Sequence, residues 1–321
     1  MSLLTILEDI KPELSALEEE LQQWVKSPSP LLSAASSHLL NAGGKRLRPA
    51  LAILCARPFA YQRGPAVRLG AALELVHMAT LVHDDVVDCS ILRRGQPTVK
   101  AVWGDQVSLH AGDHIFARAL MCIATIENPR VASVLAEVSV KMSQGEITQI
   151  LTTYDPDQSV RDYFKRIRYK TALLLSASCE LGATVGRASD RAVQALSRYG
   201  YFLGMAFQIT DDVLDIVADA SQLGKPTGSD LQQGIFTLPV ILALRRDSGG
   251  QRLRELLAQV SESEILSESL EMVRASGAVE DSLETAQNYV AKAKACLHVL
   301  PPCEHVNVLG EIADFVGNRD F

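Results

Sequence analysis

The amino-acid sequence predicts an all-α protein. Of its 321 residues, 47% are hydrophobic but only 5% are aromatic, and this composition favours helices over sheets. Apolar residues recur at helical spacing along most of the chain, whereas no alternating strand pattern persists over a useful length. Because no polar linker or fixed-period repeat divides the chain, we expect residues 1–321 to form a single helical domain.

Glycine, proline and serine clusters mark where the helices should end. Ser27–Pro30 closes an amphipathic N-terminal helix, Gly43–Gly44 is a C-cap signal, and Gly95–Pro97 turns the chain. The segment 223–234 is expected to form a loop, because it is rich in Gly, Pro, Ser and Asp. The expected helices cover residues 1–26, 31–42, 50–60, 66–92, 106–127, 129–152, 159–187, 189–219, 237–246, 250–260, 262–276, 278–299 and 306–316.

Charge and composition argue against several classes of protein. The formal charge of −7 disfavours general nucleic-acid binding. Uninterrupted apolar runs fall short of a membrane span, and Glu8, Asp9 and Glu13 lie where a secretory leader would be basic and then apolar. We therefore expect a cytoplasmic protein without a membrane span. The six cysteines contain no CxxC pair and are expected to be reduced core residues.

One acidic motif dominates the expected helix 66–92. Residues 74–95 read ELVHMATLVHDDVVDCSILRRG. On a helix, Asp84 and Asp88 lie one turn apart on the same face, and His77 continues that stripe. Two neighbouring carboxylates repel each other, and acids near a helix C-terminus are unfavourable. A cationic ligand is therefore favoured over the alternative, a solvated acidic patch.

A second copy of this motif lies far along the chain. Residues 204–215 read GMAFQITDDVLD, which places Gly204, Gln208, Asp211 and Asp215 on one helical face. If the two acidic helices face each other, several carboxylate oxygens converge on one cavity. Hard oxygen ligands of this kind suit Mg²⁺, which completes its coordination with water and substrate phosphates.

Basic residues cluster beside two turns. Residues 43–49 read GGKRLRP and place three cations next to a glycine turn and a helix start. This segment is either a charged linker or an anion clamp that uses Lys and Arg side chains with free backbone N–H groups. Arg93 and Arg94 are expected one turn beyond Asp88 on the same helix, where they could neutralise the carboxylates or bind phosphates.

With these motifs in this order, the chain resembles the trans-polyprenyl diphosphate synthases. Within that family it is most similar to the catalytic large components of bacterial heptaprenyl diphosphate synthases. The resemblance runs from about Leu39 to the C-terminus, leaving residues 1–38 as more variable N-terminal helices. It implies an isoprenoid synthase fold, which is a helical bundle with a central active-site cavity. It also implies two to three Mg²⁺ ions bound by Asp84, Asp88 and Asp211.

The resemblance assigns the remaining site residues. Those expected to bind isopentenyl diphosphate are Lys45, Arg48, His77 and Arg94. Those expected to bind the allylic diphosphate are Arg93, Lys170, Thr171, Gln208 and Lys225. Catalysis is expected to involve Asp84, Asp88, Arg93, Lys170, Asp211 and Lys225.

Several of these assignments leave alternatives open. Taken alone, His77 could be a satisfied core histidine, and the stretch around Lys170 is an ordinary charged helical face. Lys225 lies in a loop able to fold over the second acidic helix. Ile235 stands where short-chain relatives often have lysine, and Arg319 matches the closing basic residue of the family.

The implied reaction is head-to-tail prenyl transfer, in which isopentenyl diphosphate attacks the cation of an ionised allylic diphosphate. Short-chain relatives place a bulky aromatic residue four or five positions before the first Asp, where this chain has Thr80 and Ala79. With Val76 one turn further back, these residues are expected to leave the pocket open and to allow a long product, for which the menaquinone side chain is a candidate use.

The alternatives are a geranylgeranyl synthase and a class I terpene cyclase. The second DDxxD motif and residues 43–49 argue against a cyclase.

The resemblance also implies partners. Family members commonly form homodimers, and the large heptaprenyl components work with a small regulatory subunit. The product would be delivered to a membrane.

Overall fold

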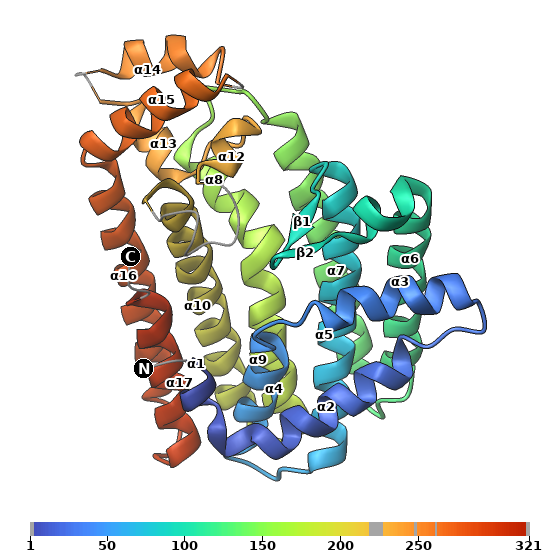
Figure 1. The fold of residues 1–321 in the computed structure, drawn as a ribbon. Coiled ribbons are helices and arrows are strands. Elements are labelled where there is room, and N and C mark those ends of the chain that lie inside the picture. Colours follow the sequence, from blue (N-terminus) through green and yellow to red (C-terminus); the bar gives the residue numbers. More distant parts are fainter. Residues whose placement is uncertain (1–2, 218–226, 247–248, 261, 319–321) are drawn as a thin grey trace. The chain divides into compact units, whose positions relative to one another are not determined.

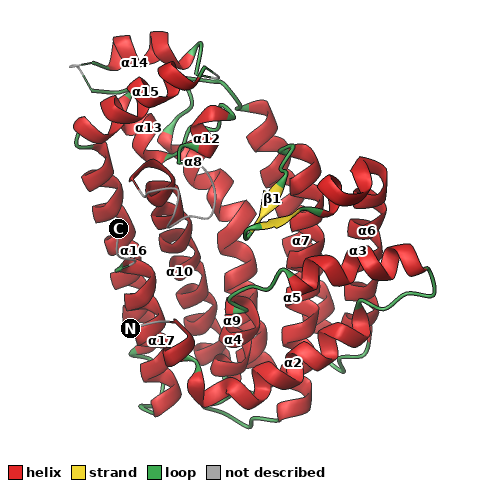
Figure 2. Cartoon of the chain, viewed as in Figure 1, coloured by secondary structure: helices red, strands yellow, loops and turns green. Residues whose placement is uncertain are grey.

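The computed structural model consists of helices and one short hairpin (Figures 1 and 2). The structure describes residues 3–217, 227–246, 249–260 and 262–318. The all-α fold class predicted from composition and periodicity is confirmed. The described chain divides into two compact units. The first contains residues 1–139, 174–200 and 296–312, and the second contains residues 140–173, 201–295 and 313–321. The expectation of a single domain stays a prediction.

The elements follow the predicted order closely. The first unit holds α1 (Leu3–Ile6), the 3-10 helix η1 (Glu8–Ile10), α2 (Lys11–Trp24), α3 (Pro30–Asn41), α4 (Leu47–Ala56), α5 (Arg63–Val87), β1 (Leu92–Arg93), β2 (Gln96–Pro97) and α6 (Val99–Ala124). The second unit holds α8 (Val160–Ile167), the π-helix η2 (Arg168–Ala172), α12 (Ser229–Gln232), α13 (Leu238–Ala243), α14 (Gly250–Leu257) and α15 (Ser263–Ala275). The helices with residues in both units are α7 (Pro129–Leu151), α9 (Leu173–Val185), α10 (Asp190–Val217), α16 (Ala278–Leu297) and α17 (Glu304–Gly317).

The long helix α5 lies at the core of the first unit and packs along α6 (Figure 1). By length and composition it could cross a membrane, and it is the one helix in the described part of the chain that could. However, 72% of its most apolar window is buried inside the protein. A core helix passes the same test of length and composition, and its burial identifies α5 as such a helix.

The prediction that the helix beginning near residue 66 continues to Leu92 is wrong. Helix α5 stops at Val87, Asp88 is its C-cap, and Cys89 has a φ of 51°, which an α-helix cannot contain. The chain then forms the antiparallel pair β1–β2. Arg94 and Gly95 connect the strands with φ values of 53° and 74°, and two positive φ values in succession are typical of a type I′ turn.

Helix α6 begins earlier than residue 106, where the sequence pattern placed it. Thr98 caps its N-terminus by accepting a hydrogen bond from the backbone N–H of Ala101 at 3.1 Å. Gly104 interrupts the helix with φ 82° and ψ 170°. This kink explains why the apolar periodicity becomes clear only further along the chain.

The expected helix 159–187 contains a π-helical turn. Ser159 opens α8 with a capping box that it shares with Asp162. At the C-terminal end of η2, the backbone N–H of Leu173 donates to the carbonyl of Arg168. Five residues therefore separate donor and acceptor instead of four, and π turns of this kind occur frequently at functional sites.

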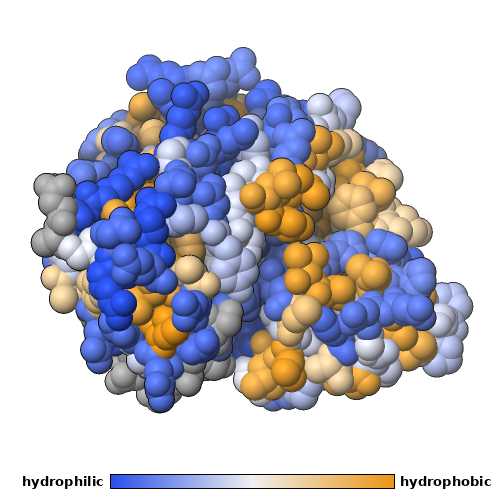
Figure 3. Space-filling model, turned by 90° about the horizontal axis from the view of Figure 1, so that it is seen from above, coloured by the Kyte–Doolittle hydropathy of each residue, from blue (hydrophilic) through white to orange (hydrophobic). Residues whose placement is uncertain are grey.

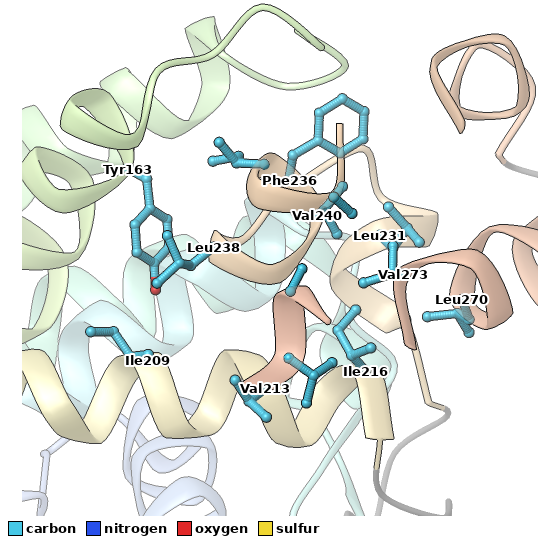
Figure 4. Close-up of a cluster of buried hydrophobic side chains, with 14 of the residues drawn as sticks. Tyr163, Ile209, Val213, Ile216, Leu231, Phe236, Leu238, Val240, Leu270 and Val273 are labelled. Carbon is cyan, nitrogen blue, oxygen red and sulfur yellow. The ribbon is translucent and has the colours of Figure 1, made fainter. Parts of the chain in front are cut away.

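The second unit has its own hydrophobic core, which α8, α10, α12, α13 and α15 build together (Figure 4). Its largest fully buried side chains include Tyr163 and Phe236. Hydrophobic groups also reach the protein surface, where they form separate patches among hydrophilic ones (Figure 3). The most exposed large hydrophobic side chains of the hairpin region are Val87, Ile91 and Leu92.

Cysteines are free thiols, as expected. Cys55, Cys122 and Cys179 are buried, and Cys296 and Cys303 are half-buried. Cys89 is exposed at the end of α5 and is not a core residue.

Candidate active site

The first aspartate motif lies at the C-terminal end of α5. Asp84 is in the last turn, and the backbone N–H of Asp88 donates to the carbonyl of Asp84 at 2.8 Å. Both side chains are half-buried. The middle residue differs, because Asp85 is only 1% exposed and accepts from Arg93 Nε at 2.9 Å, with Arg93 Nη2 at 2.7 Å from the same oxygen. The structure therefore separates Asp85 from the two aspartates expected to bind metal.

Arg93 lies on β1 and not on the helix that carries the aspartates. The prediction that Arg93 and the aspartates share one helix is therefore wrong. Its guanidinium pairs with the buried Asp85. This is the neutralising alternative that the sequence left open, because a buried carboxylate needs a compensating cation. The expected contact of Arg93 with an allylic diphosphate stays a prediction.

Arg46 has a structural role in the segment before α4. It is 8% exposed and donates to both oxygens of Glu18, at 2.6 and 3.2 Å, and to Glu74 Oε1 at 2.9 Å. The carbonyls of Leu40 and Gly43 accept its remaining N–H groups. All five donors of the guanidinium are thus used, which fixes the segment before α4.

Arg94 extends from the type I′ turn onto the glycine segment that precedes α4. A Cβ added to Gly44 would lie 2.5 Å from Arg94 Nη1. Because real Cβ atoms essentially never approach so closely, this guanidinium occupies space that only glycine leaves open. The hairpin and the segment 43–49 therefore meet at Arg94, as the assignment of both to one diphosphate requires.

His77 lies among these cations. Burial lowers its pKa well below the usual value, and the charges of Arg48, Arg94, Arg93 and Arg46 lower it further. His77 is therefore neutral at physiological pH and can donate a hydrogen bond without adding charge. Gathered guanidinium groups beside the exposed Lys45 make this part of the first unit suited to a diphosphate.

The expected product-length residues also lie on α5. Val76 and Ala79 are buried, and the hydroxyl of Thr80 donates to the carbonyl of His77 at 2.8 Å. That they measure the product stays a prediction.

In the second unit, Lys170 and Thr171 lie on the π turn η2. Lys170 Nζ is 3.0 Å from Glu146 Oε1 and 3.4 Å from Gln149 Oε1, both on α7. A Cβ on Gly145 would lie 3.2 Å from the backbone nitrogen of Lys170, so this glycine allows α7 to approach the π turn closely. Sequence reasoning missed Glu146 and Gln149, although a glycine inside a helix is a signal of close packing.

The second aspartate motif also uses its members differently. Asp215 accepts from Ser229 Oγ at 3.0 Å and from the backbone N–H of Asp230 at 3.1 Å. Its own carbonyl accepts from the N–H of Gly228 at 2.7 Å. Asp215 thereby fixes the start of α12. Asp211, the expected metal ligand, is half-buried on α10.

Asp212 is buried and bonds to Tyr163 and Gln208, at 2.7 and 2.8 Å. Burial, together with the nearby charge of Asp230, raises the pKa of Asp212 to about 7. Gln208 in turn accepts from Thr171 Oγ1 at 2.6 Å. The structure thus joins the two expected residues Thr171 and Gln208 directly. It adds Asp212, which the second DDxxD motif contains without an assigned role, and Tyr163, which no sequence signal singled out.

Asp84, Asp88 and Asp211 are the expected ligands of a hard divalent cation. Among the described residues, no three His, Cys, Asp or Glu side chains form a group that could hold a metal ion. Asp84 and Asp88 offer carboxylate oxygen donors at the C-terminal end of the helix that also carries His77. Such a donor set suits Mg²⁺, which takes one or two carboxylates together with water and phosphate oxygens. Mutual approach of the two aspartate motifs, which belong to different units, stays a prediction.

Two expected residues, Lys225 and Arg319, lie outside the described residues. The nearest described position to Lys225 is Thr227, which is half-buried.

The chain is similar to known proteins over most of its length. The family model described as polyprenyl synthetase matches residues 29–273. The chain is 43% identical to heptaprenyl diphosphate synthase component 2 from Geobacillus stearothermophilus, with 100% of each chain covered. The crystal structure of heptaprenyl diphosphate synthase from Staphylococcus aureus has a TM-score of 0.91 at 33% identity and covers 97% of this chain and 99% of its own. A polyprenyl synthase from Caulobacter crescentus, crystallised with calcium and isoprenyl diphosphate, has a TM-score of 0.95 at 33% identity, with 99% and 98% covered.

Proposed function

Because this chain belongs to the polyprenyl synthetase family and is a prenyltransferase, we propose that it condenses isopentenyl diphosphate with an allylic diphosphate. Farnesyl or geranylgeranyl diphosphate would be the primer. The product would be an all-trans polyprenyl diphosphate of about C30–C40, with heptaprenyl favoured, because Ala79 and Thr80 stand where short-chain relatives have a bulky aromatic residue. The fold is the all-α isoprenoid synthase fold implied by the two motifs.

The observation that carries this proposal is the composition of one end of α5. Carboxylates of Asp84 and Asp88 lie there in the same compact unit as the cations around His77. Carboxylates suit a divalent ion, whereas Arg48 and Arg94 suit a phosphate. A substrate that carries both a metal and a diphosphate satisfies the two groups at once.

Binding and orientation fall to the chain's own residues. Lys45, Arg48 and Arg94 would hold the diphosphate of isopentenyl diphosphate, with the neutral His77 as a hydrogen-bond donor. In the second unit, Lys170, Thr171 and Gln208 would face the allylic diphosphate, where Glu146 and Gln149 orient the Lys170 ammonium.

Asp84, Asp88 and Asp211 would hold the metal. Two to three Mg²⁺ ions would supply electrostatic stabilisation of the departing diphosphate, and the calcium in the Caulobacter crescentus structure is consistent with divalent metal use in the family. Buried apolar residues of α5 such as Val76 and Ala79 would exclude water from the allylic cation.

Chain length, partners and location complete the proposal. Relatives named component 2 imply a second, non-identical component for those enzymes, and we extend this to a small regulatory subunit here, with a homodimer as the alternative. We also propose that the enzyme is cytoplasmic and that its product enters a membrane for use as a menaquinone side chain.

One assay tests the activity. The purified chain is incubated with labelled isopentenyl diphosphate, farnesyl diphosphate and Mg²⁺, and the products are resolved by length. Long-chain product supports the proposal, geranylgeranyl product favours the shorter-chain alternative, and cyclised hydrocarbon without incorporated label would contradict it. Product that appears only after a small second component is added would show that the chain needs a heteromeric partner.

A further inference from the structure

A chain of hydrogen bonds links a buried tyrosine to the π turn of the second unit. Tyr163 Oη donates to Asp212 Oδ2 at 2.7 Å, and Gln208 Nε2 donates to Asp212 Oδ1 at 2.8 Å. Thr171 Oγ1 then donates to Gln208 Oε1 at 2.6 Å. We call these four residues the Tyr163 chain. Two of its members, Gln208 and Thr171, are expected to face the allylic diphosphate, whereas Tyr163 has no assigned role.

The first two bonds determine how the last two side chains are oriented. Ionised Asp212 accepts on both carboxylate oxygens, so Gln208 turns its NH₂ group towards Asp212. Its carbonyl oxygen then faces Thr171 and accepts the hydroxyl hydrogen. The amide of Gln208 is thereby held in one of its two possible orientations, and the hydroxyl of Thr171 follows it.

Packing holds Tyr163 itself in place. The residue is 0% exposed, and its ring lies beside Leu238 with the hydroxyl directed towards the helix that carries Ile209 and Val213 (Figure 4). The Arg166 guanidinium lies 5.5 Å from the ring centroid and donates to the carbonyl of Phe236 at 2.8 Å. A ring enclosed in this way cannot swing its hydroxyl away from Asp212.

We propose that Tyr163 is a positioning residue for the allylic diphosphate: it holds Asp212 and, through Asp212, orients Gln208 and Thr171. The inference rests on the proposed function, because it deepens the description of the same site. Tyr163 does not touch substrate. Without its hydroxyl, Asp212 Oδ2 loses this donor, the carboxylate gains freedom to rotate, and Gln208 is no longer confined to one orientation.

The test compares Tyr163→Phe with a matched control, Tyr199→Phe. Both tyrosines are 0% exposed, and Tyr199 donates to the carbonyl of Leu309 at the same 2.7 Å, so each variant removes one buried hydroxyl bond. Calorimetry with Mg²⁺ present measures binding of an unreactive allylic thiolodiphosphate, and steady-state kinetics gives KM for each substrate. Tyr163→Phe should weaken analogue binding about tenfold and leave KM for isopentenyl diphosphate unchanged. Tyr199→Phe should bind the analogue like the wild type.

A double-mutant cycle with Gln208→Ala tests whether Tyr163 acts through Gln208. In the Gln208→Ala background, Tyr163→Phe should cause no further loss of analogue binding. Additive losses, or a Tyr163→Phe variant that matches Tyr199→Phe, would overturn the inference. Should Tyr163→Phe not fold, Asp212→Asn serves instead, because an amide cannot accept from both Tyr163 and Gln208. Its analogue binding should weaken similarly, and wild-type binding by Asp212→Asn would also overturn the inference.

The two proposals fail in different ways. A wild-type protein that condenses no isopentenyl diphosphate with any allylic primer removes the proposed function and this inference with it. An active wild type, combined with equal behaviour of Tyr163→Phe and Tyr199→Phe, removes the inference and leaves the function standing.

Discussion

The guanidinium of Arg94 occupies the space beside Gly44 in which a side chain would begin, because a Cβ at Gly44 would lie only 2.5 Å from Nη1. The two residues lie in different elements, a hairpin turn and the segment before α4. Their contact brings the glycine-rich basic segment and the second basic cluster into one arrangement. Glycine is therefore required at position 44 for the position of a side chain fifty residues away in sequence.

Gly44→Ala should displace Arg94 and raise KM for isopentenyl diphosphate about tenfold, because misplacement by about 1 Å is costly at a binding site. Steady-state kinetics measures this KM in the wild type and in each variant. Gly43→Ala is the control for a side chain at positive φ, since Gly43 has φ 78° and Gly44 has φ 151°, but a Cβ on Gly43 would meet nothing within 4 Å. Equal KM values for the two variants would show that backbone strain, not the Arg94 contact, matters.

Arg46→Ala should destabilise the fold by about 3–5 kcal/mol, because it leaves the buried Glu74 without its cation. The side chains of Arg46 and Glu74 are 8% and 4% exposed. Chemical denaturation measures the free energy of unfolding. Lys294→Ala breaks an exposed pair with Asp314, whose side chains are 45% and 48% exposed, and should cost less than about 1 kcal/mol. Similar losses for both variants would contradict the structural role of Arg46.

His77 should make stability fall in acid. Its folded pKa lies well below the usual value because of burial and nearby arginines, whereas an unfolded histidine titrates near about 6.5. Below that pH the unfolded state binds a proton that the folded state does not, so the free energy of unfolding decreases as pH falls. Denaturation of the wild type and His77→Gln between about pH 8 and 5 checks this sign. A wild type that loses no more stability than the variant would refute it.

Asp84→Ala should reduce turnover by at least about a hundredfold while leaving helicity intact. The physical reason is loss of a metal-binding carboxylate at the end of α5. Turnover and far-ultraviolet circular dichroism provide the measurements, and excess EDTA should bring the wild type to a similarly low rate. The control is Asp113→Ala on the neighbouring α6, whose carboxylate is 71% exposed. Normal turnover by Asp84→Ala would end the metal assignment.

Ala79→Tyr should shorten the product, because the ring would close the floor below the aspartates. Ala79 is buried, so two outcomes separate a product channel from a packed core. In a channel the ring fits and stability changes little, whereas overpacking a core costs about 1–3 kcal/mol. Product analysis by chromatography is combined with thermal melting. Unchanged products would remove Ala79 from the length-determining residues.

Local patterns predicted most helices well, because apolar periodicity and breakers act within a few residues. The end of α5 was mispredicted for a non-local reason. The sequence from Ala71 to Leu92 contains no Gly or Pro. The helix nevertheless stops at Val87, and the β1–β2 hairpin that follows brings Arg93 into an ion pair with Asp85. The π turn at Arg168–Ala172 was equally hidden, since its five residues read as an ordinary charged helix.

Site residues were predictable only where a motif carried them. Arg46 and Arg48 look equivalent in sequence, and the structure separates them because Glu18 and Glu74, each 28 positions away, converge on Arg46. The partners of Lys170 on α7 are 21 and 24 positions away. Pairings over such separations depend on how helices pack, which periodicity does not encode.

The two DDxxD copies have the same pattern of aspartates, but their aspartates have different structural roles. In the first copy the central acid is neutralised by an arginine from the hairpin, and in the second the final acid ties down the backbone that leads into α12. Aspartates at equivalent positions of the two copies are therefore not interchangeable, because the same sequence pattern supports different contacts in each copy. Substitution of Asp215 would remove the hydrogen bonds that hold the backbone at the start of α12, whereas substitution of Asp88 would leave these bonds in place.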